Sequence, residues 1–117
     1  MAVLSKEKLS GSTDGKQIKV AATATPGTLI HTAVSGTTDL DEIWLYAYNH
    51  HTANVDLTIE WGGVASPDDL VQITIPFKAG RFLVVDGKLL QNGLIVRAFA
   101  SVANVVMIDG FVNRIDK

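Results

Sequence analysis

The side chains in this sequence that can bind metal ions or transfer protons are few and widely spaced. There are three histidines, His31, His50 and His51, and no cysteine. A disulfide framework and thiolate metal sites are therefore excluded. His50 and His51 are neighbours, so on a strand they would point to opposite faces, and only a turn could bring both to one ion. We expect this pair to lie in a solvated loop or at an interface, and we predict no metal site.

Two groups of acidic residues have the oxygen-rich chemistry that calcium prefers. Asp39, Asp41 and Glu42 form the first group, and Asp68 and Asp69 form the second. Neither group has the spaced acids, central glycine and terminal glutamate of the twelve-residue calcium loop. We therefore expect solvated carboxylates at strand ends, together with a turn closed by an aspartate side chain.

Glu60 next to Trp61 is the one pairing that suggests sugar chemistry, because sugar-binding sites often combine a carboxylate with an aromatic platform. Glycoside hydrolysis needs two carboxylates at a set separation. Alternation places Glu60 on the solvent side of its strand, and no second acid can be assigned opposite it. Two Gly-Lys pairs also occur, but neither is followed by the Ser or Thr of a phosphate-binding loop. We expect a protein that is not an enzyme and has no cofactor.

The composition predicts one globular domain. The chain has 117 residues, of which 47% are hydrophobic and 19% charged, and its formal net charge is -2. This balance is unlike that of a disordered chain, and the basic residues are scattered, so we expect no nucleic-acid partner. The longest apolar run, residues 43–48, is far shorter than the roughly 20 residues of a membrane helix, and no export signal is visible.

The first sixteen residues differ from the remainder of the chain. The segment from Ser5 to Lys16 is polar and is interrupted only by Leu9. We predict an N-terminal arm over residues 1–16 and a β-sandwich domain over residues 17–117. The arm is either a frayed terminus or a segment that becomes ordered on a partner.

From residue 17 onward, apolar residues alternate with polar ones between turn-forming dipeptides, which is typical of strands. The dipeptides Asp86-Gly87 and Asn92-Gly93 predict tight turns, and Gly110 predicts a bulge or bend within the last strand. The fold expected is all-β, a jelly-roll-like antiparallel β-sandwich of about eight strands with a short N-terminal arm. An immunoglobulin-type sandwich is the nearest alternative, although its disulfide is absent. The expected strands are 17–23, 28–34, 40–49, 55–61, 71–75, 81–85, 94–100 and 105–115.

The strand at 40–49 has two apolar faces. Trp44, Tyr46 and Tyr48 share one face, and aliphatic residues at 43, 45 and 47 share the other. If the aliphatic face is in the core, the aromatic face points outward and is a candidate interface, since Trp and Tyr are enriched where proteins meet. If the orientation is reversed, the aromatic residues are core. Both alternatives remain open from the sequence.

Most of the chain, from about Asp14 to Ile115, resembles bacteriophage structural proteins that are taken to decorate or cement capsids. The similar stretches are LDEIWLYA at 40–47, LTIEWGG at 57–63, SPDD at 66–69, NGLIVRAFA at 92–100 and GFVNRI at 110–115. They form a pattern of structural residues and not a catalytic signature.

This resemblance implies a homotrimer on the capsid exterior of a virion, assembled in the host cytoplasm, with the major capsid protein as its partner. The trimer would bind between capsid subunits and stabilise the assembled shell by mass action. Lys6 and Leu9 of the arm, together with Trp44, Tyr46 and Tyr48, would be the candidate contact residues. A tail, fibre or adaptor component of a virion and a carbohydrate-binding β-sandwich module are the alternatives.

Overall fold

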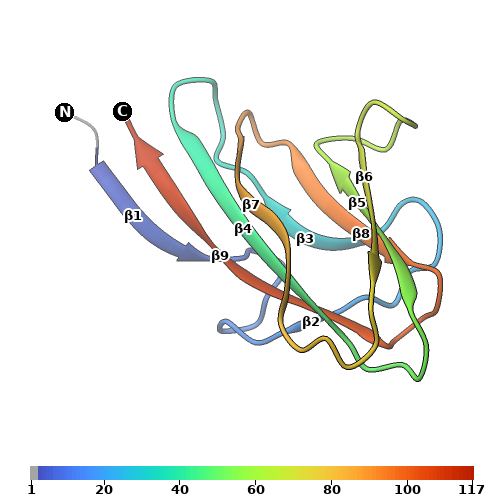
Figure 1. Ribbon diagram of the computed structural model, residues 1–117. Helices are drawn as coiled ribbons and strands as arrows, with labels where there is room; N and C mark the ends of the chain where they lie inside the picture. The colour runs from blue at the N-terminus through green and yellow to red at the C-terminus, as the bar shows by residue number, and fades with distance from the viewer. Residues whose placement is uncertain (1–2) are drawn as a thin grey trace.

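The computed structural model describes residues 3–117, which form a sandwich of two antiparallel β-sheets (Figure 1). The described residues form nine strands and no helix, and this confirms the expected all-β sandwich. Within this part of the chain there is accordingly no helix with the length and apolar character to cross a bilayer.

The two sheets have five and four strands. The larger sheet contains, in spatial order, β1 (Val3–Lys8), β9 (Val106–Asp116), β4 (Leu40–Asn49) and β7 (Phe82–Leu90), with β2 (Ile18–Lys19) also paired to β9. The smaller sheet contains, in spatial order, β3 (Thr28–Thr32), β8 (Ile95–Ala100), β5 (Val55–Trp61) and β6 (Leu70–Ile75).

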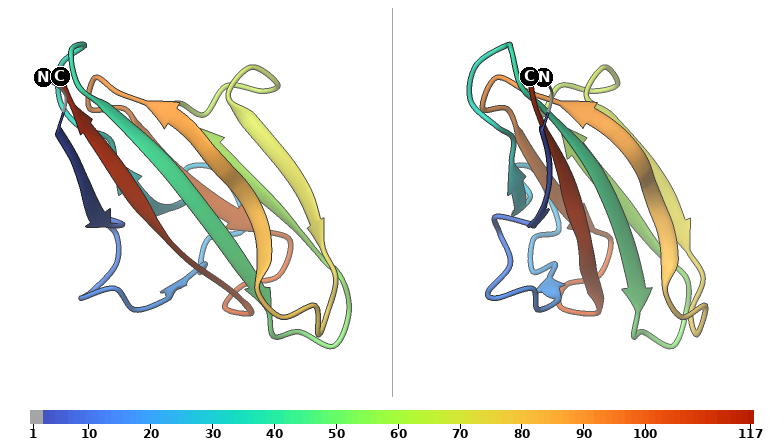
Figure 2. Two further views of the ribbon diagram at one scale, coloured as in Figure 1. Left: turned by 60° about the vertical axis from the view of Figure 1, so that its left-hand side comes forward. Right: turned by 90° about the vertical axis from the view of Figure 1, so that its left-hand side faces the viewer.

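The chain passes repeatedly from one sheet to the other, so that several loops connect the two layers (Figure 2). Strands β1 and β2 lie on the same side of β9, where β1 pairs with residues 111–116 and β2 with residues 107–108. One position in the sheet is thus shared by two short strands. This division explains why the structure has nine strands where the sequence predicts about eight.

The core fills the space between the layers and follows the alternation expected of strands. On β4 the aliphatic side chains of Ile43 and Leu45 are fully buried, as are Leu57 and Ile59 of β5 and Ile108 of β9. Full burial of each such side chain stabilises the fold by about 1.5–3 kcal/mol. The core is therefore made chiefly by the inner faces of the three central strands β4, β5 and β9 together with β8.

The expectation of a separate N-terminal arm is wrong for the described part of the segment. Residues 3–8 form β1, and all six of them pair with β9. Leu9 is fully buried in the core, and the Gly11 N–H donates to the Ile30 carbonyl on β3. The polar side chains of residues 3–8 suggest a segment without a core of its own. An edge strand such as β1 is held by backbone hydrogen bonds to its neighbour and needs few buried side chains. Residues 1 and 2 of the predicted arm lie outside the described residues.

Two further expectations about glycines are corrected by the pairing of β4. Asp86-Gly87 is not a hairpin turn, because β7 runs through it, with two shifts of register against β4. Gly110 is not at a bulge, because β9 pairs with β4 without interruption from Val106 to Ile115. The predicted turn at Asn92-Gly93 is present, and both residues have the positive φ that such a turn requires.

Gly110 serves instead to let two central strands approach closely. A Cβ atom at this position would overlap the backbone carbonyl of Trp44 on β4. Neither strand can move aside easily, because β4 is also paired with β7 and β9 is also paired with β1 and β2. Glycine is therefore required here by space.

We expect Gly110→Ala to lower the free energy of unfolding by about 3 kcal/mol or more, because the added methyl group must push two paired strands apart. Gly36→Ala is the matched control, since Gly36 has a φ of 79° but a Cβ added there would have no neighbour within 4 Å. It should cost only about 1–2 kcal/mol from backbone strain. Urea unfolding measures both values. Equal losses in the two variants would contradict the steric explanation.

Candidate functional site

The outer surface of the larger sheet carries the aromatic residues of β4. Along this strand the core side and the outer side alternate without exception, and Trp44, Tyr46 and Tyr48 are on the outer side, each partly exposed. Of the two orientations left open by the sequence, the structure therefore has the one with the aromatic residues outward. We call the outer surface of the larger sheet around these three residues the aromatic face.

One half of the aromatic face is centred on Trp44. Its indole stacks on Phe111 of β9, with ring centroids 6.0 Å apart and planes 12° apart. The indole N–H donates to Glu42 Oε1 at 2.7 Å, and the Asn113 amide donates to the same oxygen at 3.0 Å. Hydrogen bonds from Trp44 and then Asn113 hold the pKa of Glu42 below its ordinary value. The carboxylate therefore stays charged and keeps the indole in one orientation.

The other half is centred on Arg81, which precedes β7. Its guanidinium lies 3.6 Å from the centroid of the Tyr46 ring and also contacts Asp109, with Nε 3.4 Å from Oδ1. The Tyr48 hydroxyl donates to Asp109 Oδ2 at 3.3 Å. Burial, and then the charge of Asp109, raise the pKa of Tyr48 above its ordinary value. These contacts order the two tyrosines before any partner binds, which reduces the entropy lost on binding.

Exposed leucines extend the aromatic face toward both edges of the sheet. Leu83 and Leu89 of β7 are 45% and 50% exposed and lie opposite Tyr46 and Glu42 in the register, so they share the outer side. At the other edge Leu4 is 67% exposed. Lys6, also on β1, places its ammonium group 4.4 Å from the centroid of the Phe111 ring. The aromatic face therefore combines exposed apolar side chains at both edges with polar and charged groups at its centre, and cations lie over two of its rings.

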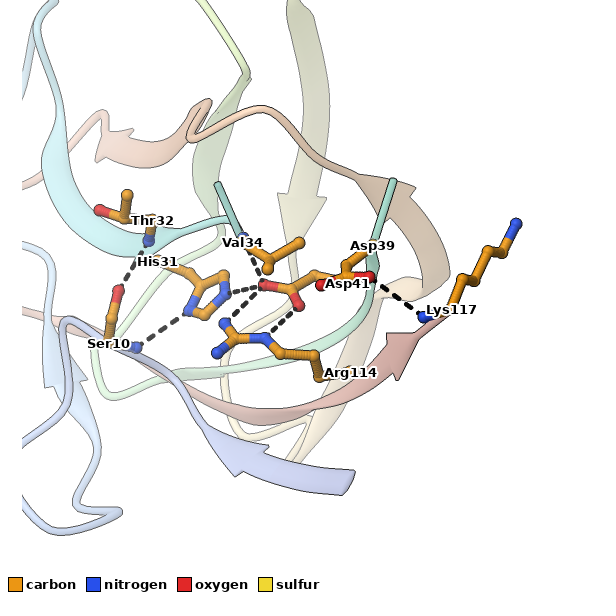
Figure 3. Close-up of polar contacts among 8 residues, drawn as sticks. All are labelled: Ser10, His31, Thr32, Val34, Asp39, Asp41, Arg114 and Lys117. Carbon is orange, nitrogen blue, oxygen red and sulfur yellow. Dashed lines mark hydrogen bonds and ion pairs between the residues drawn. The ribbon is translucent and has the colours of Figure 1, made fainter. Parts of the chain in front are cut away.

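A second polar arrangement lies inside the sandwich and is centred on Asp41 (Figure 3). Asp41 is fully buried on the core side of β4 and pairs with Arg114 of β9, whose Nε is 2.8 Å from Oδ1 and Nη2 is 3.0 Å from Oδ2. His31 Nε2 is 2.8 Å from Oδ2, and the Val34 N–H donates to that oxygen at 3.0 Å. We call these residues the Asp41 cluster.

The Asp41 cluster keeps its carboxylate ionised. Burial alone would raise the pKa of Asp41, but the hydrogen bonds from Arg114 and His31 and the charge of Arg114 outweigh it and hold this pKa below its ordinary value. The same hydrogen bond from Arg114 to Asp41 raises the pKa of Arg114. The pair therefore remains charged in the folded protein at neutral pH, and it acts as a fixed link between β4 and β9.

The hydrogen bonds of His31 show that the Asp41 cluster is structural and not a catalytic triad. The backbone N–H of Ser10 donates to His31 Nδ1 at 3.0 Å, so Nδ1 is the acceptor nitrogen and Nε2–H donates to Asp41. The Ser10 hydroxyl accepts the Thr32 N–H at 2.6 Å and makes no bond to the imidazole. A serine nucleophile would need the histidine as its base. The cluster instead joins the β1–β2 connection to β3, β4 and β9.

Glu60 does not lie on a solvent-facing surface as its alternation predicts. Its side chain is only 1% exposed. The Thr25 hydroxyl donates to one carboxylate oxygen at 2.6 Å and the Gly27 N–H to the other at 2.7 Å. The segment before β3 lies against the outer side of the smaller sheet, close enough that a Cβ on Gly27 would come within 2.7 Å of the Ala98 backbone nitrogen. Glu60 thus holds a turn in place, and it is not available to a sugar.

The expectation that the acidic residues are solvated is wrong for Asp41, which is fully buried, whereas Asp68 is exposed as expected. Asp41 and Glu42 lie on opposite faces of β4, and Asp39 accepts the backbone N–H of Lys117 at 3.0 Å. Asp69 accepts the Ala65 N–H at 3.1 Å within their common turn. Over residues 3–117 no three or more His, Asp or Glu side chains are grouped so as to hold a metal ion.

We expect Asp41→Asn to lower the free energy of unfolding at pH 7 by about 1.5–3 kcal/mol, because Arg114, which is 31% exposed, would lose its charged partner. The pKa of Asp41 is lower in the folded state, so its contribution is present above its unfolded pKa, about 3.9, and is lost as the pH falls through the folded pKa. The difference from wild type should therefore shrink below about pH 4.

Urea unfolding at several pH values measures this difference. Asp68→Asn is the matched control, since Asp68 is exposed and its loss should cost less than about 0.5 kcal/mol. A difference between Asp41→Asn and wild type that stays constant from neutral to acidic pH would show that Asp41 is not stabilised by its charge.

The structure brings together most of the sequence-predicted contact residues. Trp44, Tyr46 and Tyr48 form the centre of the aromatic face, and Lys6 lies at its margin above Phe111. Leu9 lies elsewhere, in the core, and is not exposed to a partner. In comparisons with known proteins, no family model, no curated protein and no solved structure matches this chain.

Proposed function

We propose that this protein is a bacteriophage virion component that decorates the capsid exterior and stabilises the shell by binding between major capsid subunits as a trimer. The observation that carries the proposal is the aromatic face. Three aromatic residues and several exposed leucines lie on the outer surface of the larger sheet. The core between the two sheets is made by other side chains, so these residues are not needed to fill it. In this proposal the protein acts by binding and not by catalysis.

The chemistry of the aromatic face supports a protein partner. Interfaces are enriched in Trp, Tyr, Phe and Arg, which bury a large area and keep a polar group for hydrogen bonding. Trp44, Tyr46, Phe111 and Arg81 supply these residue types on one sheet surface. Exposed apolar patches are a common mark of sites where proteins bind other proteins. A second or third copy of the chain and a capsid subunit are both partners that such a surface fits.

The order of the strands supports the finer interpretation of the sandwich as a jelly roll. If β1 and β2 are counted together as the first strand, the larger sheet has the order first, eighth, third, sixth. The smaller sheet then has the order second, seventh, fourth, fifth. Eight antiparallel strands arranged so that paired Greek keys wrap into two sheets are the arrangement of jelly rolls, which are frequent in viral shells.

Shell stabilisation would follow from mass action. A protein that binds the assembled shell, and not its separate subunits, shifts the equilibrium toward assembly. Trimerisation would let three weak contacts act together and so raise the affinity without any new kind of contact. In this arrangement Lys6 is a candidate contact at the margin of the aromatic face, whereas Leu9 contributes to the core of each subunit.

Another virion role, as a tail, fibre or adaptor component, would use the same face against a different partner. The carbohydrate-binding alternative loses its original support, because Glu60 is buried and bonded to Thr25 and Gly27. Binding to assembled shells therefore separates the leading proposal from the other virion roles.

We expect the double variant Leu83→Lys, Leu89→Lys to lose binding to assembled capsids by at least about 100-fold, because two charges would be buried at the interface. Both leucines are about half exposed, so the fold should survive. Val64→Lys is the matched control, since Val64 is 50% exposed on the β5–β6 connection, away from the aromatic face. Co-sedimentation with empty shells measures the binding.

The solution mass of the wild type by light scattering completes the experiment. A mass near three times 12.5 kDa is expected for the trimer. A monomer that does not sediment with shells, or a double variant that binds as well as the control, would reject the proposal. Shell binding by a monomer would reject the trimeric form of it.

A further inference from the structure

A hollow of about 540 Å³ lies at one end of β4. It is separate from the aromatic face, with which it shares only Tyr48 among its described lining residues. It lies between the β4–β5 connection, residues 50–54, and the β6–β7 connection, residues 76–81. We call it the end hollow. Its volume is within the range of roughly 300–1,000 Å³ that is common for small-molecule sites. We propose that the end hollow binds an acidic sugar, through its carboxylate and one face of its ring.

Two asparagines hold the walls of the end hollow in place. Asn49 donates to the Ile75 carbonyl at 2.8 Å and to the Ala53 carbonyl at 3.0 Å, and its own side-chain oxygen accepts the His51 N–H at 2.8 Å. Asn54 accepts the Phe77 N–H at 3.3 Å. Both connections are thus linked to each other through side chains. A site whose walls are already ordered loses little entropy when a ligand binds.

The polar groups around the end hollow suit an anion. His50, His51 and Lys78 line it, and within residues 3–117 neither imidazole nor the ammonium group has a hydrogen-bond partner. No carboxylate of the described chain lines the hollow. Asp109, which Tyr48 contacts, is already bound by Arg81. A negative ligand would therefore find donors that nothing else in the described chain occupies.

The aromatic groups indicate that the anion is carried on a ring. Tyr48 and His50 stack with centroids 6.3 Å apart and planes 17° apart, so two nearly parallel rings line the hollow. Phe77, 46% exposed, lines the same hollow from the other connection. Bare phosphate has no apolar surface to place on these rings. A sugar ring has one, and its hydroxyls can bond to the Thr52 hydroxyl and the imidazoles.

This inference is independent of the proposed capsid role. Lys78, His51 and Thr52 line the end hollow, whereas the ring contacts at the centre of the aromatic face are made by other residues, Trp44 with Phe111 and Tyr46 with Arg81. Variants in the end hollow therefore test sugar binding alone. A failed shell-binding experiment would leave the inference standing, and a failed sugar-binding experiment would leave the proposed function standing.

The experiment is an NMR titration of the ¹⁵N-labelled full chain with digalacturonate, with neutral lactose and inorganic phosphate as comparison ligands. Digalacturonate should shift the amide signals of Tyr48, His50, His51 and Thr52 in a saturable way, and lactose and phosphate should not. Lys78→Asn should weaken the binding about tenfold or more, because it removes the fixed positive charge that the described residues place at the hollow. Lys78 has a φ of 59°, which Asn tolerates.

Lys16→Asn is the matched control, because it removes the same charge from an exposed residue on the β1–β2 connection. It should bind digalacturonate like the wild type. His51→Gln is a second variant that should also weaken binding, in case Lys78→Asn is poorly folded. The inference is wrong if digalacturonate gives no saturable shifts, if lactose or phosphate binds equally well, or if the control loses as much affinity as the hollow variants.

Discussion

The architecture depends on one partly buried ionic contact, between Asp41 of β4 and Arg114 of β9. These two residues face each other in the register of the two longest strands. If the two strands slid past each other, Asp41 would lose Arg114 and would be a buried carboxylate without a partner. That loss would destabilise the fold, so the contact fixes the register of the strands. A slip of one residue would also turn every side chain of β9 to the wrong side of the sheet. The same register places Phe111 beside Trp44 and Asp109 beside Tyr46. The aromatic face on the outside is therefore set by a contact on the inside.

Strand positions were predictable where short-range alternation decides them. The bounds of β4 and β5 agree with the expected ranges 40–49 and 55–61, because both strands have a regular apolar face in the core. The same alternation already places Asp41 on the side of Ile43 and Leu45, which was the available signal for a buried carboxylate. Its partner was not predictable, since Arg114 is 73 residues away along the chain and only the pairing of β4 with β9 brings them together.

The expectations that failed all depend on contacts between distant segments. The alternation along β5 places Glu60 on the side of the strand that is expected to face solvent, but the segment around Gly27 covers it. The sequence near Glu60 contains no signal for this contact. Residues 3–8 look like a free arm because their side chains are polar, although their backbone pairs fully with β9. The orientation of Trp44 was undecided because both faces of β4 are apolar, so composition favours neither. In each case the position of a distant strand or loop decides whether the residue is buried or paired, and the residue type alone does not.

The cations on the aromatic face restrict which partners it can accept. Arg81 lies over Tyr46 and Lys6 over Phe111, so the rings are covered by charged groups when the protein is free. In the free protein this arrangement costs little, since both charged groups remain hydrated at the surface while they contact the rings. A partner that buries the rings must also bury or displace these charges, and a charge that is buried without a partner destabilises a complex. Arg81 already contacts Asp109, so the complementary surface needs carboxylates or carbonyl oxygens chiefly near Lys6, in addition to an apolar centre. Apolar area supplies the attraction in such an interface, and the charged groups at its margin supply its selectivity.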